Sequence, residues 1–140
     1  MFQDTDEKRT YTLLLVDDNR LHQEYVIRIF EDKRYRIYSV NDGEEALKRM
    51  KTMRPDIILL DVIMPGISGF EVCKRIKNNN ETYNIPVIFL TSKTDNESIV
   101  KGFEVGGSDY ITIPFNPDEL IARVHTHLEL KTRREKLEQV

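Results

Sequence analysis

Residues 55–66 read PDIILLDVIMPG, and this stretch decides the fold class. The run Ile57-Ile-Leu-Leu60 is apolar at every position, which is typical of a strand covered by helices on both faces. It ends at Asp61, and Pro65 and Gly66 then predict a turn-rich loop before a helical pattern begins. The stretch therefore predicts a fully buried strand whose last side chain is a carboxylate.

The same alternation of an apolar run and a helical pattern occurs five times along the chain. Upstream, the runs are residues 11–16 and about 35–40, and downstream they are 87–90 and about 109–112. Parallel strands connected by helical segments of about 10 to 15 residues form right-handed βαβ units. The sequence therefore predicts an α/β protein, with a five-stranded parallel sheet in a three-layer sandwich.

Length and composition limit the other possibilities. The chain has 140 residues, of which 39% are hydrophobic, so we expect one globular domain with an ordinary core. It has 21 Lys and Arg against 24 Asp and Glu, a balance that argues against direct contact with nucleic acid. One cysteine excludes a disulfide framework, and neither a signal peptide nor an apolar run that could span a membrane is present. We therefore expect a cytoplasmic protein that does not contact membranes, with a polar leader over residues 1–10, a domain over 11–128 and a charged helical extension over 129–140.

Candidate functional residues follow the strands of the predicted sheet. Asp17 and Asp18 come after the first strand, Asp61 after the third and Thr91 after the fourth. In an open parallel sheet, ligands bind outside the carboxyl ends of the strands, where these side chains would meet. Carboxylates this close raise one another's pKa unless a cation neutralises them. A hard divalent cation such as Mg²⁺ (or Mn²⁺) with oxygen ligands would do so, and it commonly serves phosphoryl chemistry.

Each of these residues also has an ordinary structural interpretation. Residues 17–19 (Asp-Asp-Asn) offer an N-cap for the first helix, and Asp61 suits a turn. Thr91 or Ser92 is expected to cap the helix that follows the fourth strand. These interpretations do not predict that the polar residues fall at the ends of strands one, three and four together.

Four motifs give the chain a specific resemblance to a known family. They are LVDDN at 15–19, LLDVIMPG at 59–66, LTS at 90–92, and GGSDY at 106–110 followed by Pro114-Phe115. Over about residues 11–128, the chain resembles the receiver domain of two-component response regulators. The resemblance implies a flavodoxin-like sheet with strand order 2-1-3-4-5 and five flanking helices.

The resemblance also implies a function, phosphorylation-controlled signal transduction. Asp61 would accept a phosphoryl group from the phosphohistidine of a histidine kinase or histidine phosphotransfer protein, forming an acyl phosphate. Mg²⁺ would be bound by Asp18 directly, by Asp17 mainly through water, by Asp61 and by the backbone carbonyl of Ile63. The domain would be no enzyme beyond its own phosphorylation and dephosphorylation.

Further roles come from the same resemblance. Thr91 would donate a hydrogen bond to the phosphoryl group, and Tyr110 would change its packing between the two states. The peptide bond before Pro114 would be cis. Ile63 and Lys93, each two residues beyond a site residue, would modulate the site and favour slow self-dephosphorylation.

Ile113 departs from the family pattern, which has a lysine at this position. Isoleucine supplies neither a charge nor a hydrogen-bond donor to Asp61. We expect Mg²⁺ to bind still, with phosphorylation slower or its conformational effect weaker. The alternative is a degenerate receiver in which Ile113 only extends the core, acting as an interaction module that is never phosphorylated. A remote alternative is a Mg²⁺-dependent phosphohydrolase, but Ile63 stands where a second acid would be useful.

The remaining features are weaker. Leu130 and Leu137 lie seven residues apart in the charged extension, which suggests a helix leading to an output module absent from this chain, a homodimer contact, or a solvated helix end. His22, His125 and His127 lack metal-ligand spacing and are expected at the surface or partly packed.

Overall fold

The computed structural model describes residues 9–31 and 34–139. Residues 1–8, most of the predicted polar leader, lie outside this range, as does residue 140. The element order alternates strand and helix throughout, as predicted. The strands are β1 (Tyr11–Val16), β2 (Tyr35–Val40), β3 (Ile57–Leu60), β4 (Val87–Thr91) and β5 (Asp109–Thr112). The helices are α2 (Arg20–Phe30), α3 (Gly43–Arg49), α4 (Gly69–Lys77), α5 (Asn96–Glu104) and α6 (Pro117–Glu138).

All five strands are parallel and form one sheet in the order β2-β1-β3-β4-β5. This confirms the predicted fold class and strand order. The order reverses between β1 and β3, because the chain first moves outward to β2 and then crosses back. Loops at the carboxyl ends of β1 and β3 therefore separate in opposite directions and leave a site open between them.

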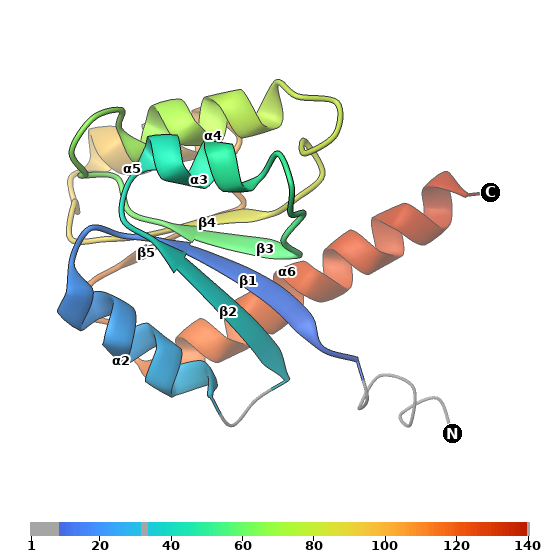
Figure 1. Cartoon of the computed structure of the whole chain (residues 1–140), viewed down its shortest axis with the longest axis horizontal. Helices are drawn as coiled ribbons and strands as arrows, with labels where there is room; N and C mark the ends of the chain where they lie inside the picture. The colour runs from blue at the N-terminus through green and yellow to red at the C-terminus, as the bar shows by residue number, and fades with distance from the viewer. Residues whose placement is uncertain (1–8, 32–33, 140) are drawn as a thin grey trace.

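Helices cover both faces of the sheet, with α2 and α6 on one face and α3, α4 and α5 on the other (Figure 1). Side chains of successive strand residues point to opposite faces. In β1, Leu13 and Leu15 pack into the core beneath α2 and α6, whereas Leu14 and Val16 pack beneath α3 and α4. This division explains why the central strands are apolar at every position. Burying one such side chain stabilises the fold by roughly 1.5–3 kcal/mol.

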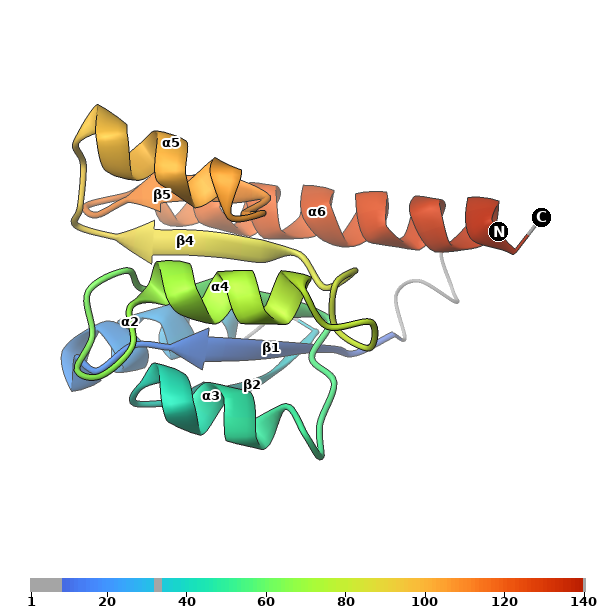
Figure 2. The same cartoon turned by 90° about the horizontal axis from the view of Figure 1, so that it is seen from above.

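The carboxyl ends of the strands lie at one edge of the sheet, and the far end of α6 extends past the opposite edge (Figure 2). The predicted domain boundary between residues 128 and 129 falls within α6, which continues to Glu138 without a break. Glu135 accepts hydrogen bonds from Lys131 at 2.8 Å and from Asn84 in the loop before β4 at 3.0 Å. The extension is therefore tied to the domain at Glu135, whereas Leu130 and Leu137 are exposed.

Candidate functional site

Asp17, Asp18 and Asp61 form one acidic cluster at the carboxyl edge of the sheet. Each offers a carboxylate oxygen, and these oxygens lie within 4.8 Å of one another. The backbone explains the placement: Asp17 N donates to Val40 O at 3.1 Å, and Asp61 N donates to Val16 O at 3.0 Å. Both residues thus continue the ladders of β1 and β3, which fixes their side chains beside each other.

The electrostatics of the cluster are unfavourable in the absence of a cation. Burial raises the pKa of Asp17, although a hydrogen bond from the backbone of Asn19 lowers it, and the charge of Asp61 raises it further. Burial likewise raises the pKa of Asp61, against the stabilising effect of the Thr91 hydroxyl and of nearby backbone N–H groups. Three oxygen donors at this separation, with ionisation opposed by burial and mutual repulsion, suit a hard divalent cation.

The loop after β4 links Thr91 to Tyr110. Thr91 is fully buried, and its Oγ1 accepts a hydrogen bond from the backbone N–H of Lys93 at 3.2 Å. The hydroxyl of Tyr110 donates to the carbonyl of Lys93 at 2.6 Å. Residue 93 thus contacts both Thr91 and Tyr110 through its backbone. Its side chain is paired with Asp95, the two charged groups being 3.3 Å apart.

Ile113 lies next to Thr91 at the end of the sheet. Its backbone N–H donates to Thr91 O at 2.9 Å, and its partly buried side chain packs against the core beneath α2 and α6. The Ile113–Pro114 peptide bond is cis, the geometry expected above. Ile63 is 58% exposed at the rim of the cluster, and its N–H donates to Asp61 Oδ1 at 3.3 Å.

The observed helix N-caps agree only in part with the expectations from the sequence. Asn19 caps α2, because its side chain accepts from the backbone N–H of His22, so residues 17–19 serve both as a cap and as part of the site. The expectation that Thr91 or Ser92 caps the next helix is wrong. Asp95 caps α5 by accepting from the backbone N–H of Ser98, because the helix begins only at Asn96.

Two features of the site were missed in the sequence. The first is Gly69, where a Cβ would lie 2.1 Å from the carbonyl oxygen of Asp61. A glycine is required here because α4 begins in direct contact with the backbone of the loop after β3. The second is His22, whose Nδ1 lies 3.5 Å from Asp17 Oδ2. Its position three residues after Asn19, in the first turn of the predicted helix, was the available signal.

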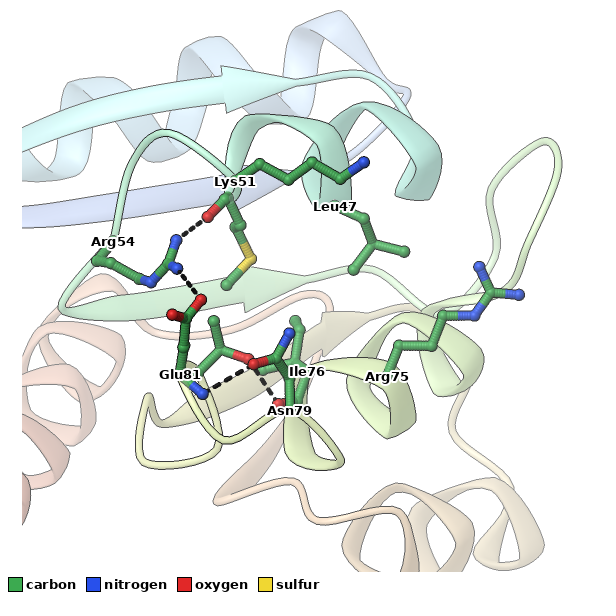
Figure 3. Close-up of a pocket in the computed structure, with 9 residues that line it drawn as sticks. Leu47, Lys51, Arg54, Arg75, Ile76, Asn79 and Glu81 are labelled. Atoms are coloured by element: carbon green, nitrogen blue, oxygen red, sulfur yellow. Dashed lines mark hydrogen bonds and ion pairs between the residues drawn. The ribbon is translucent and has the colours of Figure 1, made fainter.

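A separate hollow of about 280 Å³ lies between α3 and α4, at their carboxyl ends (Figure 3). Its lining includes the apolar side chains of Leu47 and Ile76 and the basic residues Lys51 and Arg54. The Arg54 guanidinium is 2.7 Å from the carboxylate of Glu81, so its charge is neutralised within the chain. None of the predicted site residues lines this hollow, which is distinct from the acidic cluster.

Comparison with known proteins agrees with this geometry. A family model described as response regulator receiver domain matches residues 13–125. The chain is 40% identical over 119 residues to transcriptional regulatory protein YvrH of Bacillus subtilis, covering 84% of this chain and 49% of that protein. It is 36% identical over 116 residues to DNA-binding response regulator MtrA of Mycolicibacterium paratuberculosis, covering 83% of this chain and 50% of that protein.

A solved structure has the same fold. The BeF3-activated receiver domain of DrrB, a Thermotoga maritima protein, matches with a TM-score of 0.78 and 36% identity, over 86% of this chain and 99% of that one. The chain spans about half the length of the curated relatives it matches. Because MtrA is named a DNA-binding protein, the comparisons do not support the expectation of no contact with nucleic acid. In the described part of the chain, no helix has the length and hydropathy needed to cross a membrane.

Proposed function

This chain belongs to the receiver domains of response regulators, which act as phosphoacceptors in signal transduction, and we propose that Asp61 is the side chain that accepts the phosphoryl group. A carboxylate oxygen of Asp61 attacks phosphorus, an O–P bond forms, and the bond from phosphorus to the donor breaks. With a phosphohistidine donor the departing imidazole nitrogen takes a proton. The position of Asp61 at the end of β3, within the acidic cluster, is the observation that carries the proposal.

The acidic cluster would bind Mg²⁺ or Mn²⁺ through Asp17, Asp18, Asp61 and the backbone carbonyl of Ile63. The fit rests on three carboxylate oxygens within 4.8 Å of one another and on the burial that raises the pKa of Asp17 and Asp61. Bound there, the cation supplies charge neutralisation as negative charge develops on the phosphoryl oxygens. Asp17 and Asp18 would hold it beside Asp61, whose carboxylate would stay ionised and nucleophilic.

Thr91 and Tyr110 would transmit the change. Once Asp61 carries a phosphoryl group, the Thr91 hydroxyl donates to it and moves away from the N–H of Lys93. Since the Lys93 carbonyl holds the Tyr110 hydroxyl, a shift of this loop releases Tyr110 to a new packing. The phosphoryl charge is thereby converted into a change of shape on the surface formed by β5 and α5.

Ile113 and Lys93 would make this site differ from a receiver with the usual lysine. Burial is the main cause of the raised pKa of Asp61, and in the described residues no cationic side chain is paired with that carboxylate. Phosphorylation is therefore slower here. Ile63 and Lys93 at the rim restrict the approach of water and slow the self-dephosphorylation.

The partners follow from the same chemistry. A histidine kinase or histidine phosphotransfer protein would donate the phosphoryl group in the cytoplasm. This chain matches only about half the length of these relatives, which supports a covalently linked output module joined through residues 129–140. Such an output could contact DNA, and the exposed Leu130 and Leu137 would serve a homodimer.

One observation favours a second candidate. Ile113 packs against the core, as expected of a degenerate receiver that serves as an interaction module without phosphorylation. The phosphohydrolase has no such support, because Ile63, two residues beyond Asp61, offers no acid.

Intact-mass spectrometry after incubation with acetyl phosphate and Mg²⁺ tests the proposal. We expect a gain of one phosphoryl group that requires Mg²⁺ and is absent in Asp61→Ala. Asp56→Ala is the control, because Asp56 lies before β3 and its carboxylate binds the backbone of Thr12. An adduct on Asp61→Ala would contradict the assignment, and Mg²⁺ binding without any adduct from acetyl phosphate or a phosphohistidine donor would favour the interaction module.

A further inference from the structure

The first turn of α2 approaches both carboxylate oxygens of Asp17. The backbone N–H of Asn19 donates to Oδ1 at 2.8 Å, and Nδ1 of His22 lies 3.5 Å from Oδ2. The side-chain amide of Gln23, the residue after His22, donates to the backbone carbonyl of Asp17. Since the Asn19 side chain accepts from His22 N at 3.1 Å, the position of His22 is itself fixed by the helix cap. The same turn thus restrains Asp17 at its backbone and at its side chain.

The His22 ring has an unusual environment for a residue near the surface. Its side chain is 41% exposed, but its Nδ1 is buried and lacks a hydrogen-bond partner among the described residues. A buried donor without a partner costs about 1–3 kcal/mol. The separation of 3.5 Å from Asp17 Oδ2 exceeds a hydrogen bond by only a few tenths of an ångström. A small rotation of the Asp17 carboxylate would satisfy both groups.

Direct coordination of a metal by His22 fits less well. The cluster whose ligand atoms lie mutually within 4.8 Å contains Asp17, Asp18 and Asp61 but not the imidazole. His22 therefore reaches the carboxylate of Asp17 rather than the centre of the cluster. A carboxylate oxygen has two lone pairs, so Oδ2 can accept a hydrogen bond from Nδ1–H of His22 and still face a cation or its water.

We propose that His22 is a positioning residue for the metal site, donating from Nδ1 to Oδ2 of Asp17 and holding that carboxylate in its cation-binding orientation. The inference rests on the proposed function, because it requires a divalent cation at the acidic cluster. A carboxylate held on both oxygens loses less rotational freedom when the cation binds. Partners of this kind, which orient a metal ligand without touching the metal, commonly change metal affinity by about 10- to 100-fold.

Mg²⁺ titration calorimetry on the whole chain, at fixed pH and ionic strength, tests the role of His22. We expect His22→Leu to raise the apparent Kd for Mg²⁺ by about tenfold. His22→Asn should remain within about twofold of the wild type, because its Nδ2 is attached to Cγ as Nδ1 is in histidine. Asparagine is a poorer helix former than leucine. If the substitutions acted only through helix stability, His22→Asn would therefore weaken Mg²⁺ binding more than His22→Leu.

Three results would overturn the inference. One is an unchanged Kd in His22→Leu, provided that Asp18→Asn abolishes binding and the proposed metal site is thereby established. Another is equal weakening in His22→Leu and His22→Asn with a much larger loss for Mn²⁺ than for Mg²⁺, which would make the imidazole a direct ligand. The third is a wild-type chain that binds neither cation, in which case the proposed metal site fails and the inference fails with it.

Discussion

The acidic cluster and the surroundings of Asp109 are built from the same kind of side chain with opposite results. Burial opposes the ionisation of Asp109, but hydrogen bonds from His127, from its neighbour's backbone N–H and from Arg123 outweigh it and lower the pKa. Arg123 Nη1 lies 2.9 Å from Oδ1 of Asp109, and His127 Nε2 lies 3.1 Å from Oδ2. Burial of Asp17 and Asp61 is not offset in this way, and their pKa values are raised.

The comparison separates a structural carboxylate from candidate functional ones. Asp109 at the start of β5 has its partners within the chain and joins the sheet to α6, so its charge contributes to stability. Asp61 has no charged partner among the described residues, and Asp17 has only the imidazole of His22 at 3.5 Å, so a bound cation would be needed to offset the repulsion between the two carboxylates. Carboxylates that the fold leaves uncompensated are therefore the better candidates for a binding site.

The largest change in the free energy of unfolding is expected at Asp109, where substitution tests whether the carboxylate is structural. Asp109→Ala should lower the free energy of unfolding by about 2 kcal/mol, because Arg123 and the less exposed His127 lose their shared acceptor. Urea unfolding at pH 7 measures it. His125→Ala is the control on the same helix, since His125 only pairs with Glu129 at the surface. A change below about 0.5 kcal/mol would show that Asp109 is not structural.

A change of opposite sign is expected at the acidic cluster. Asp17→Asn should raise the free energy of unfolding in EDTA by roughly 0.5–2 kcal/mol, because it removes a buried charge beside Asp61 and keeps an acceptor for Asn19. Glu129→Gln removes the same unit of charge from exposed α6 and should change stability little. Mg²⁺ should stabilise the wild type more than Asp17→Asn. Destabilisation in EDTA would show that Asp17 is compensated after all.

The pH dependence of the free energy of unfolding should distinguish the two regions further. The expected changes are a fraction of the mutational effects at Asp109 and Asp17. The folded-state pKa of Asp17 is raised, so the folded chain takes up this proton first and gains stability as the pH falls from 7 towards about 4. The advantage of Asp17→Asn in EDTA should shrink over that range. The pKa of Asp109 is lowered, so its contribution is complete above about 4 and is lost as the pH falls further. Urea unfolding from pH 7 to about 3 in EDTA measures both slopes, and parallel curves for the wild type and both variants would refute the assignment.

The smallest effect is expected from giving the acidic cluster a cation of the kind that Asp109 has. Ile113→Lys should speed phosphorylation by acetyl phosphate by up to about fivefold, corresponding to about 1 kcal/mol from a partly exposed ion pair. Ile113→Met controls for side-chain length without charge. Time courses by intact-mass spectrometry measure the rates. Equal rates for the two variants would show that a charge at residue 113 does not limit the reaction.

Much of the fold could be read from local patterns. The apolar runs that end at Val16, Leu60 and near Thr91 identified the three central strands, because a strand buried on both faces leaves no polar positions. Asp42, with Glu45 three residues on, has the sequence pattern of a helix N-cap, and it caps α3. The cap of α5 could not be read in the same way, because Thr91, Ser92 and Asp95 are all suitable residues and only the path of the loop chooses Asp95.

The sequence by itself determined the alternation of strands and helices, and it placed Asp17, Asp18 and Asp61 at strand ends. These follow from hydrophobic periodicity and short motifs, which act over a few neighbouring residues. Only the tertiary structure decided that Gly69 touches the carbonyl of Asp61, that His22 faces Asp17, and that Arg123 and His127 neutralise Asp109. Burial and the distances between charges far apart in the chain set which carboxylates are compensated, and the fold alone fixes these.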